Sequence, residues 1–147
     1  MNDRVFIDTN ILVYAHVAND AVKQEKAARL LKTRLFGKNV FVGVQVLSEF
    51  YVTMAKYKYG HGDIANWIHS IIQTANVASL STFTVETALE LKGKYGYSYW
   101  DSLIISCALE NGCGILYTED MQHSQLVDGQ LLIVNPFSDE PIQSHGK

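Results

Sequence analysis

The chain has 147 residues, 48% of them hydrophobic, and a formal net charge of −3 at pH 7, which together are typical of one globular domain with an ordinary core. No apolar run approaches the roughly 18 residues of a membrane span, and the first residues, MNDRVF, do not resemble a secretory signal. The two cysteines, Cys107 and Cys113, are too few for a disulfide framework or a zinc cluster. We therefore expect a soluble, cytoplasmic protein that does not associate with membranes.

Short apolar runs alternate with helical periodicity in the first half of the chain. Strands are expected over residues 5–7 and 39–43, and helices over residues 10–16, 19–37, 44–58 and 61–75. The second of these helices has Asn19 or Asp20 as N-cap and ends at Gly37. Its apolar residues lie near helical spacing, at Val22, Ala27, Leu30, Leu31 and Leu35. In the fourth helix, Asp63 is the expected N-cap.

The second half of the chain continues this alternation. Residues 77–80, 114–120 and 130–137 have the composition of strands, and residues 81–96 and 98–112 that of helices. Strands alternating with helices predict an α/β sandwich with a largely parallel sheet. We expect a single domain over residues 1–137, followed by a polar tail, residues 138–147, that frays.

Ligands of open parallel sheets bind beyond the carboxyl ends of the strands, so the acids expected there are of special interest. Asp8 directly follows the first strand, and Glu119 and Asp120 follow the strand that contains GILY. Glu49 comes one or two helical turns after the second strand. Asp101 lies at the start of an apolar helix, where a carboxylate is partly desolvated unless a cation or strong donor meets it.

Each acid also has a purely structural interpretation. Asp8 is a good helix cap, and Glu49 fits the solvated face of its helix. Asp101 fits a capping box with Ser98 as N-cap, and a Thr-Glu-Asp turn after a strand is common in loops. The four positions taken together carry more weight than any one of them, because two follow strands, one opens an apolar helix and one follows the second strand; for Glu49 this requires its helix face to turn towards the strand ends.

Clustered carboxylates repel one another unless protons or divalent cations intervene. Oxygen ligands suit Mg²⁺ or Mn²⁺, and the chemistry that fits them is metal-assisted attack of water on a phosphodiester. The net charge neither excludes nor supports such a substrate: with four of the 15 acids assigned to metal ions, 11 remain against 12 Lys and Arg.

Four segments, FIDTNILVYA, VLSEFY, SYWDSLIISCALENGC and LYTEDMQ, resemble in order and spacing the PIN-domain nucleases, most closely the VapC-type toxins of toxin–antitoxin pairs. The resemblance extends from Arg4 to about Phe137. It implies a three-layer α/β/α sandwich with a mostly parallel central sheet. It also implies a Mg²⁺- or Mn²⁺-dependent endoribonuclease, a cognate antitoxin and a homodimer.

The resemblance also assigns roles to individual residues. Asp8, Glu49 and Asp101 match the first three metal-binding acids, and Asp120 is preferred as the fourth, with Glu119 able to share or replace it. Thr9 and Asn10 match polar residues that support the first acid through hydrogen bonds, and Thr118 matches a hydroxyl position of the family motif that supports the site from behind the ligands. By analogy, Asp8 and Asp101 hold the principal ion, while Glu49 and Asp120 complete its shell or help to hold a second, and cleavage leaves a 5′-phosphate and a 3′-hydroxyl.

Several other residues are weaker candidates. Four lysines could contact phosphate, although lysines are usually just solvated: Lys56, Lys58, Lys92 and Lys94. His123 could act as a general base, but loop histidines rarely do. Five tyrosines could stack on RNA bases or pack a dimer or antitoxin interface, which we prefer: Tyr57, Tyr59, Tyr95, Tyr97 and Tyr99.

Two alternatives to a nuclease remain at this stage. The first is a PIN-like interaction module with weak or no catalysis, which could still bind metal through the same acids. The second is an aspartyl phosphatase that uses Asp8 as nucleophile. Such enzymes usually carry a second Asp two positions later, where this chain has Asn10, and a clear lysine motif does not follow.

Overall fold

The computed structural model describes residues 2–17, 19–34 and 38–145, and over these residues the chain forms six strands and six helices. The strands are β1 (Val5–Ile7), β2 (Val40–Gly43), β3 (Asn76–Ala78), β4 (Ile115–Tyr117), β5 (Leu126–Val127) and β6 (Leu131–Val134). They form one sheet in the order β3-β2-β1-β4-β6-β5, in which every pair is parallel except β5 with β6. The predicted, largely parallel sheet is confirmed.

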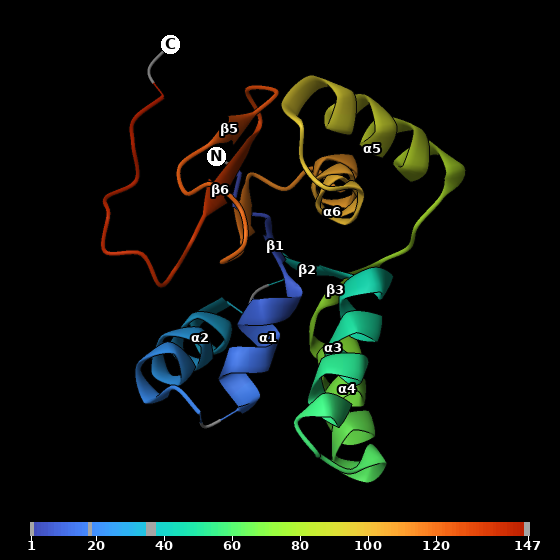
Figure 1. The fold of residues 1–147 in the computed structure, drawn as a ribbon, viewed down its shortest axis with the longest axis vertical. Helices are drawn as coiled ribbons and strands as arrows, with labels where there is room; N and C mark the ends of the chain where they lie inside the picture. Colours follow the sequence, from blue (N-terminus) through green and yellow to red (C-terminus); the bar gives the residue numbers. More distant parts are fainter. Residues whose placement is uncertain (1, 18, 35–37, 146–147) are drawn as a thin grey trace.

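The helices occupy the connections between the parallel strands. They are α1 (Thr9–His16), α2 (Ala21–Arg34), α3 (Val44–Lys56), α4 (His61–Thr74), α5 (Thr82–Tyr95) and α6 (Tyr99–Glu110). Figure 1 shows them in pairs around the sheet, α1 beside α2, α3 beside α4, and α5 beside α6. The arrangement is the three-layer α/β/α sandwich that the resemblance implies.

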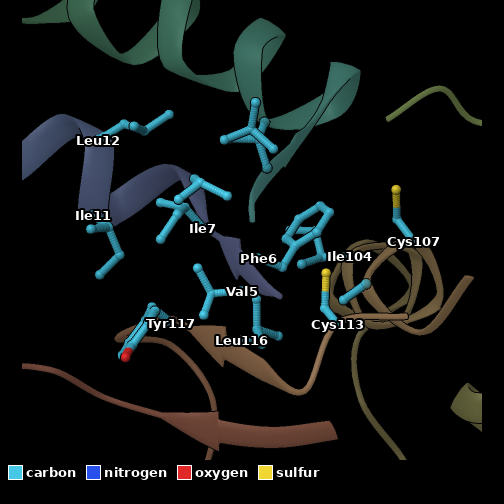
Figure 2. Packing of buried hydrophobic residues seen from close by; sticks show 14 of the residues in the cluster. Val5, Phe6, Ile7, Ile11, Leu12, Ile104, Cys107, Cys113, Leu116 and Tyr117 are labelled. Carbon is cyan, nitrogen blue, oxygen red and sulfur yellow. The ribbon is translucent and has the colours of Figure 1, made fainter. Parts of the chain in front are cut away.

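β1 is the central strand that organises the core. It pairs with β2 on one side and β4 on the other, and all three of its residues are buried. Side chains alternate across a strand, so neighbouring residues of β1 serve opposite faces of the sheet. In Figure 2, Phe6 lies near Ile104 of α6, whereas Ile7 lies near α1. Burial on both faces explains why this strand is apolar throughout.

Most helix ends follow the expected capping chemistry. Ser81 caps α5 through a capping box with Thr84, and Gly96 ends this helix at a left-handed φ of 79°. At α2, the Asp20 carboxylate accepts the backbone N–H of Lys23, as an N-cap does. Leu35 and the predicted end of this helix at Gly37 lie outside the described residues.

The predicted cap of α4 is wrong. Gly60 is the N-cap and provides no side-chain acceptor, whereas Asp63 lies inside the first turn. An acid in that position is favourable for a different reason, because the first turn of a helix carries the positive end of the helix dipole. The acid near the helix start therefore indicated the helix but misplaced its N-cap by three positions.

β5 is a strand that the sequence analysis missed. It pairs antiparallel with β6 through a tight turn in which Asp128 and Gly129 have φ values of 50° and 66°. Two consecutive left-handed residues define the type I′ hairpin turn, for which Asp-Gly is a preferred pair. The dipeptide was therefore a usable signal, although a strand of two residues is too short to show a periodic pattern.

Residues 135–145, which follow β6, form neither helix nor strand, and their backbone is hydrogen-bonded near residues 123–124. The Glu140 carbonyl contacts His123 Nε2 at 3.0 Å, and the Gln143 N–H donates to Ser124 Oγ at 3.0 Å. The separation of the tail from the domain at residue 137 stays a prediction. The buried cysteines Cys107 and Cys113 are free thiols. None of the described helices combines the length and apolarity needed to cross a membrane.

Candidate active site

A cleft of about 370 Å³ opens at the carboxyl edge of the sheet, beside the ends of β1 and β4. Its walls come from the start of α1, one face of α3, the start of α6 and the residues that follow β4. The cleft is lined by Asp8, Thr9, Asn10, Val13, Tyr14, Glu49, Thr53, Tyr57, Trp100, Asp101, Ile104, Glu119 and Asp120. All five acids singled out from the sequence therefore meet in one place.

Asp8 lies at the base of this cleft and is only 3% exposed. Its backbone N–H donates to the Tyr117 carbonyl at 3.0 Å, which fixes the residue at the point where β1 and β4 end. Its Oδ1 accepts the Thr9 N–H at 2.7 Å, and its Oδ2 accepts the Thr118 hydroxyl at 2.7 Å. Because a carboxylate offers about four acceptor positions, about two remain for a further ligand.

Thr118 connects Asp8 to the loop that follows β4. Its fully buried hydroxyl donates to Asp8 and accepts the Asp120 N–H at 3.2 Å. Asn10 extends the network: its Nδ2 donates to Asp120 Oδ2 at 2.9 Å, while its Oδ1 accepts the Glu119 N–H at 3.1 Å. Thr118 thus contacts Asp8 directly, whereas Asn10 holds the loop that carries Asp120.

Thr9 holds Glu49 by a side-chain hydrogen bond. The Thr9 hydroxyl, at the start of α1, donates to Glu49 Oε1 on α3 at 3.1 Å. The contact shows that the face of α3 carrying Glu49 is turned towards the strand ends. The alternative interpretation of Glu49, as part of a purely solvated helix face, does not fit this placement.

Asp101 lies in the first turn of α6, with Ser98 as N-cap. Its backbone N–H donates to Ser98 Oγ at 3.1 Å, which is one half of the predicted capping box. Partial burial raises the pKa of the Asp101 carboxyl; hydrogen bonding to Ser98 opposes this, and the charge of Asp120 adds to it. Asp101 therefore takes part in the cap of α6, and its carboxylate also interacts electrostatically with Asp120.

Glu119 and Asp120 have different surroundings, although they are adjacent in the sequence. Glu119 accepts the Tyr14 hydroxyl at 2.8 Å and forms an ion pair with Lys23 of α2, and this contact raises the pKa of Lys23. Asp120 instead accepts the Asn10 amide, close to Asp8. The positive partner of Glu119 neutralises its charge, so Asp120 is the better candidate for the fourth acid.

The acids influence one another electrostatically. The pKa of Asp8 is raised to about 6, chiefly by desolvation; the hydrogen bonds from Thr118 and Thr9 oppose this rise, and the charges of Asp120 and Glu49 add to it. Asp120 also raises the pKa of Asp101. The charges of Asp120 and Glu49 thus oppose ionisation of Asp8, and the charge of Asp120 opposes ionisation of Asp101. A bound cation would relieve this repulsion.

The donor set fits a hard divalent cation, because every candidate ligand is an oxygen atom. Over residues 2–17, 19–34 and 38–145, no three Asp, Glu, His or Cys side chains converge closely enough to form a protein-only ligand cage. Mg²⁺ is commonly bound by one or two carboxylates together with water and substrate phosphate. Asp8, with acceptor positions remaining and a charge opposed by its neighbours, is the most suitable first ligand.

Among the weaker candidates from the sequence, Lys56 lies next to the cleft, whereas Lys92, Lys94 and His123 make contacts elsewhere in the structure. Lys56 lines a shallow hollow together with Glu49 and Thr53, next to the cleft. Lys94 instead pairs with Asp128 at 2.8 Å, and Lys92 donates to the Tyr97 carbonyl. His123 Nδ1 accepts the Asn135 N–H at 3.0 Å and its Nε2 lies 3.0 Å from the Glu140 carbonyl oxygen, so this ring joins two loop segments.

Five cleft residues were not singled out from the sequence: Val13, Tyr14, Thr53, Trp100 and Ile104. Trp100 directly precedes Asp101, and Thr53 lies one helical turn after Glu49, so proximity to predicted site residues was an available signal. The partner of Glu119 had no such signal, because Lys23 is 96 residues away in the sequence. Only the packing of α2 against α1 brings it to the loop after β4.

The PIN domain family model matches residues 5–128, and the chain therefore belongs to the PIN domain family. Curated protein sequences gave no significant match. The structure is similar to a toxin–antitoxin complex from Klebsiella pneumoniae, with 19% identity, a TM-score of 0.68, and coverage of 90% of this chain and 98% of that one.

It is also similar to Mycobacterium tuberculosis VapC20, a toxin that cleaves the sarcin–ricin loop. In that comparison the identity is 22% and the TM-score 0.64, with coverage of 79% of this chain and 89% of the other. At these identities the likeness establishes a shared fold.

Proposed function

We propose that this protein is a metal-dependent endoribonuclease and the toxin of a toxin–antitoxin pair. The observation that carries the proposal is the convergence of Asp8, Glu49, Asp101 and Asp120 in one cleft at the carboxyl edge of a parallel sheet. Membership of the PIN domain family supports a nuclease. The RNA-cleaving activity of VapC20 and the antitoxin of the Klebsiella complex support the choice of substrate and partner.

Mg²⁺ or Mn²⁺ is the proposed cofactor. Bound among these carboxylates, such an ion supplies charge neutralisation and an activated water for attack on a phosphodiester. Asp8 and Asp101 are the proposed main ligands, with Glu49 and Asp120 completing the set directly, through water, or at a second ion. Glu119 is not assigned to this set because Lys23 already neutralises it.

The remaining residues of the site orient these acids. Thr118 and the Thr9 N–H hold both oxygens of Asp8, the Thr9 hydroxyl holds Glu49, and Asn10 holds Asp120. Such supporting hydrogen bonds fix a ligand in place and tune its basicity. The proposed partners are RNA, a cognate antitoxin and a second copy of the chain, the last because the PIN-domain resemblance implies a homodimer.

The test is cleavage of a mixed cellular RNA pool by the purified protein with Mg²⁺, with Mn²⁺ or with EDTA. We expect discrete fragments that require the metal, and an Asp8→Asn variant at least about 100-fold less active. Asp3→Asn is the matched control, because it removes one carboxylate from an exposed residue that does not line the cleft. It should cut RNA as the wild type does.

Three results would contradict the proposal. Equal cleavage by wild type and Asp8→Asn would remove Asp8 from the reaction. Release of inorganic phosphate from a phosphomonoester, without RNA fragments, would favour the aspartyl phosphatase. Metal binding without cleavage of any RNA in the pool, in protein shown to be free of antitoxin, would favour the interaction module.

A further inference from the structure

We infer that Trp100 and Tyr57 form a subsite that binds unpaired RNA bases beside the acidic cleft. The inference rests on the proposed function and specifies its substrate class, namely single-stranded segments whose bases are free to stack. Both aromatic side chains line the same cleft as the acids, Trp100 from the start of α6 and Tyr57 from the residue that ends α3.

The exposure of Trp100 is the first observation that supports this inference. Trp100 is 62% exposed although it directly precedes Asp101, and tryptophan is normally among the largely buried residue types. The indole ring of Trp100 makes an edge contact with the ring of Tyr99, at 5.5 Å between centroids. A large aromatic surface is therefore presented to solvent at the edge of a polar cleft, where a planar ligand could cover it.

Tyr57 provides a second surface at a distance from the acids. The cleft is lined by Glu49 and Thr53 of α3 and by Tyr57, the C-cap of this helix. They are spaced four residues apart, so they lie along one side of the helix. The eight residues from Glu49 to Tyr57 correspond to about 12 Å along a helix axis. Tyr57 is 46% exposed. A strand of RNA with its phosphate at the acids could therefore extend past this ring.

Among the five tyrosines singled out from the sequence, only Tyr57 lines the cleft. Tyr59 packs against Trp67 at 5.3 Å between ring centroids, and the Tyr95 hydroxyl donates to Asp128 at 2.7 Å. Tyr57 is therefore the candidate for base stacking, because it lines the cleft, whereas Tyr59 and Tyr95 contact other residues. The aromatic faces are sequence-tolerant, because every base has a π-surface.

An antitoxin segment could also cover Trp100, since tryptophan is frequent at protein interfaces. The position beside the acids favours RNA: a phosphodiester placed for cleavage brings its own flanking bases to this wall of the cleft. The two occupants can be separated experimentally. A base requires the flat aromatic face, whereas an apolar protein side chain can also pack on a leucine.

The experiment measures affinity for a short single-stranded RNA from a region that the wild type cuts, using Asp8→Asn as an uncleaving background. In this background, Trp100→Ala should weaken binding by about 10- to 100-fold. Trp100→Phe should retain most of the affinity and Trp100→Leu should not. The same oligonucleotide in a fully paired duplex should show little difference between these variants.

Phe83→Ala is the matched control, because Phe83 is 63% exposed and does not line the cleft. A second readout uses Trp67→Phe, which leaves Trp100 as the single tryptophan; its fluorescence should be quenched by single-stranded RNA. In otherwise wild-type protein, Trp100→Ala should mainly raise KM and change kcat little, since the substitution removes binding away from the reacting atoms.

Unchanged affinity in Trp100→Ala, with RNA cleavage by the wild type intact, would overturn this inference alone. Trp100→Leu binding RNA as well as the wild type would also overturn it, because leucine has no stacking face. Loss of antitoxin binding but not of RNA binding would assign the surface to a protein partner instead. Absence of both RNA cleavage and RNA binding in the wild type would overturn the proposed function itself.

Discussion

Asp8 illustrates how a single residue can be unfavourable for the fold and still be held firmly within it. The residue is almost completely buried, accepts two hydrogen bonds from the protein and has a pKa of about 6. Burial of the charged form therefore weakens the metal-free protein at neutral pH. Such a position is typical of a site that a ligand completes, because structural requirements alone would favour a neutral side chain there.

The first prediction concerns the stability of the metal-free protein. The raised pKa means that ionised Asp8 destabilises the folded state above about pH 6, and that this penalty disappears as pH falls towards the unfolded value near 3.9. In EDTA at pH 7, Asp8→Asn should raise the free energy of unfolding by about 1–2 kcal/mol, less than the full pKa shift would give because the Thr118 hydroxyl loses its carboxylate acceptor. Urea unfolding measures this difference.

Two further measurements check the interpretation. At pH 4 Asp8→Asn should be slightly less stable than the wild type, because the charge penalty has almost disappeared while the loss of the acceptor for the Thr118 hydroxyl remains. Mn²⁺ should stabilise the wild type and not the variant, because binding to the folded state alone adds to its stability. A variant less stable than the wild type at every pH would show that the hydrogen bonds of Asp8 outweigh its burial.

The second prediction separates the two adjacent acids of the loop after β4. Asp120→Asn should reduce RNA cleavage by about 100-fold, because it removes a carboxylate next to Asp8. Glu119→Gln should retain most of the activity, because this carboxylate is paired with Lys23. Cleavage rates of the two isosteric variants provide the comparison; a larger loss in Glu119→Gln would exchange the two assignments.

At this scale the sequence predicted which acids would meet, and the family resemblance named Thr9, Asn10 and Thr118 as their supports, but neither specified the contact that each support makes. Asp8, Asp101 and the adjacent pair Glu119 and Asp120 were accessible because strand ends and helix starts can be located from periodicity, whereas the choice of Glu49 and of Asp120 over Glu119 depended on the family resemblance. The role of Lys23 was not accessible, since it depends on the rotation of α2 about its axis and on its packing against α1. The structure also assigns Asn10 to the Asp120 loop, a contact that no local pattern specifies.

The elements themselves were largely predictable, and the errors have identifiable causes. Strongly apolar segments such as β1 and α6 were located correctly because burial determines their composition. β5 was missed because it has two residues and its pairing partner, rather than its own composition, makes it a strand. The cap of α4 was misplaced because an acid is favourable both at the N-cap and within the first turn.

The third prediction concerns the β5–β6 hairpin. Hydrogen bonds from Lys94 and Tyr95 lower the pKa of Asp128, so its charge stabilises the folded protein above the unfolded value near 3.9 and this contribution is lost as pH falls through the lower folded value. Asp128→Asn should therefore destabilise the protein at pH 7 and be close to neutral at pH 2–3. Asparagine accepts a left-handed φ, so the substitution isolates the charge.

The control for this prediction is Asp139→Asn, in which an exposed acid is changed that pairs only distantly with Lys26, at 3.9 Å. Its effect on the free energy of unfolding should be small, and nearly the same at both pH values. If Asp128→Asn destabilised the protein equally at low and neutral pH, the turn geometry rather than the charge would account for the role of Asp128.

At the scale of the whole molecule, the fourth prediction tests the division between the domain and its tail. A chain ending at residue 137 should unfold cooperatively and lose about 1–2 kcal/mol of stability, because the tail contributes a few backbone contacts near residues 123–124. RNA cleavage should persist, since the cleft is lined by residues no later than Asp120. Thermal unfolding and the cleavage assay together check this; loss of cooperative unfolding would place the tail within the domain.

The position of β1 between β2 and β4 has a consequence for synthesis of the protein. Asp8 is made 110 residues before its hydroxyl donor, Thr118, and the two meet only when β4 pairs with β1. Glu49 and Asp101 are likewise synthesised before Asp120. A ribosome-bound chain that has not yet emerged beyond β4 therefore has no assembled cleft, and under the proposed function this order of assembly would delay RNA cleavage until β4 and the loop after it have been translated.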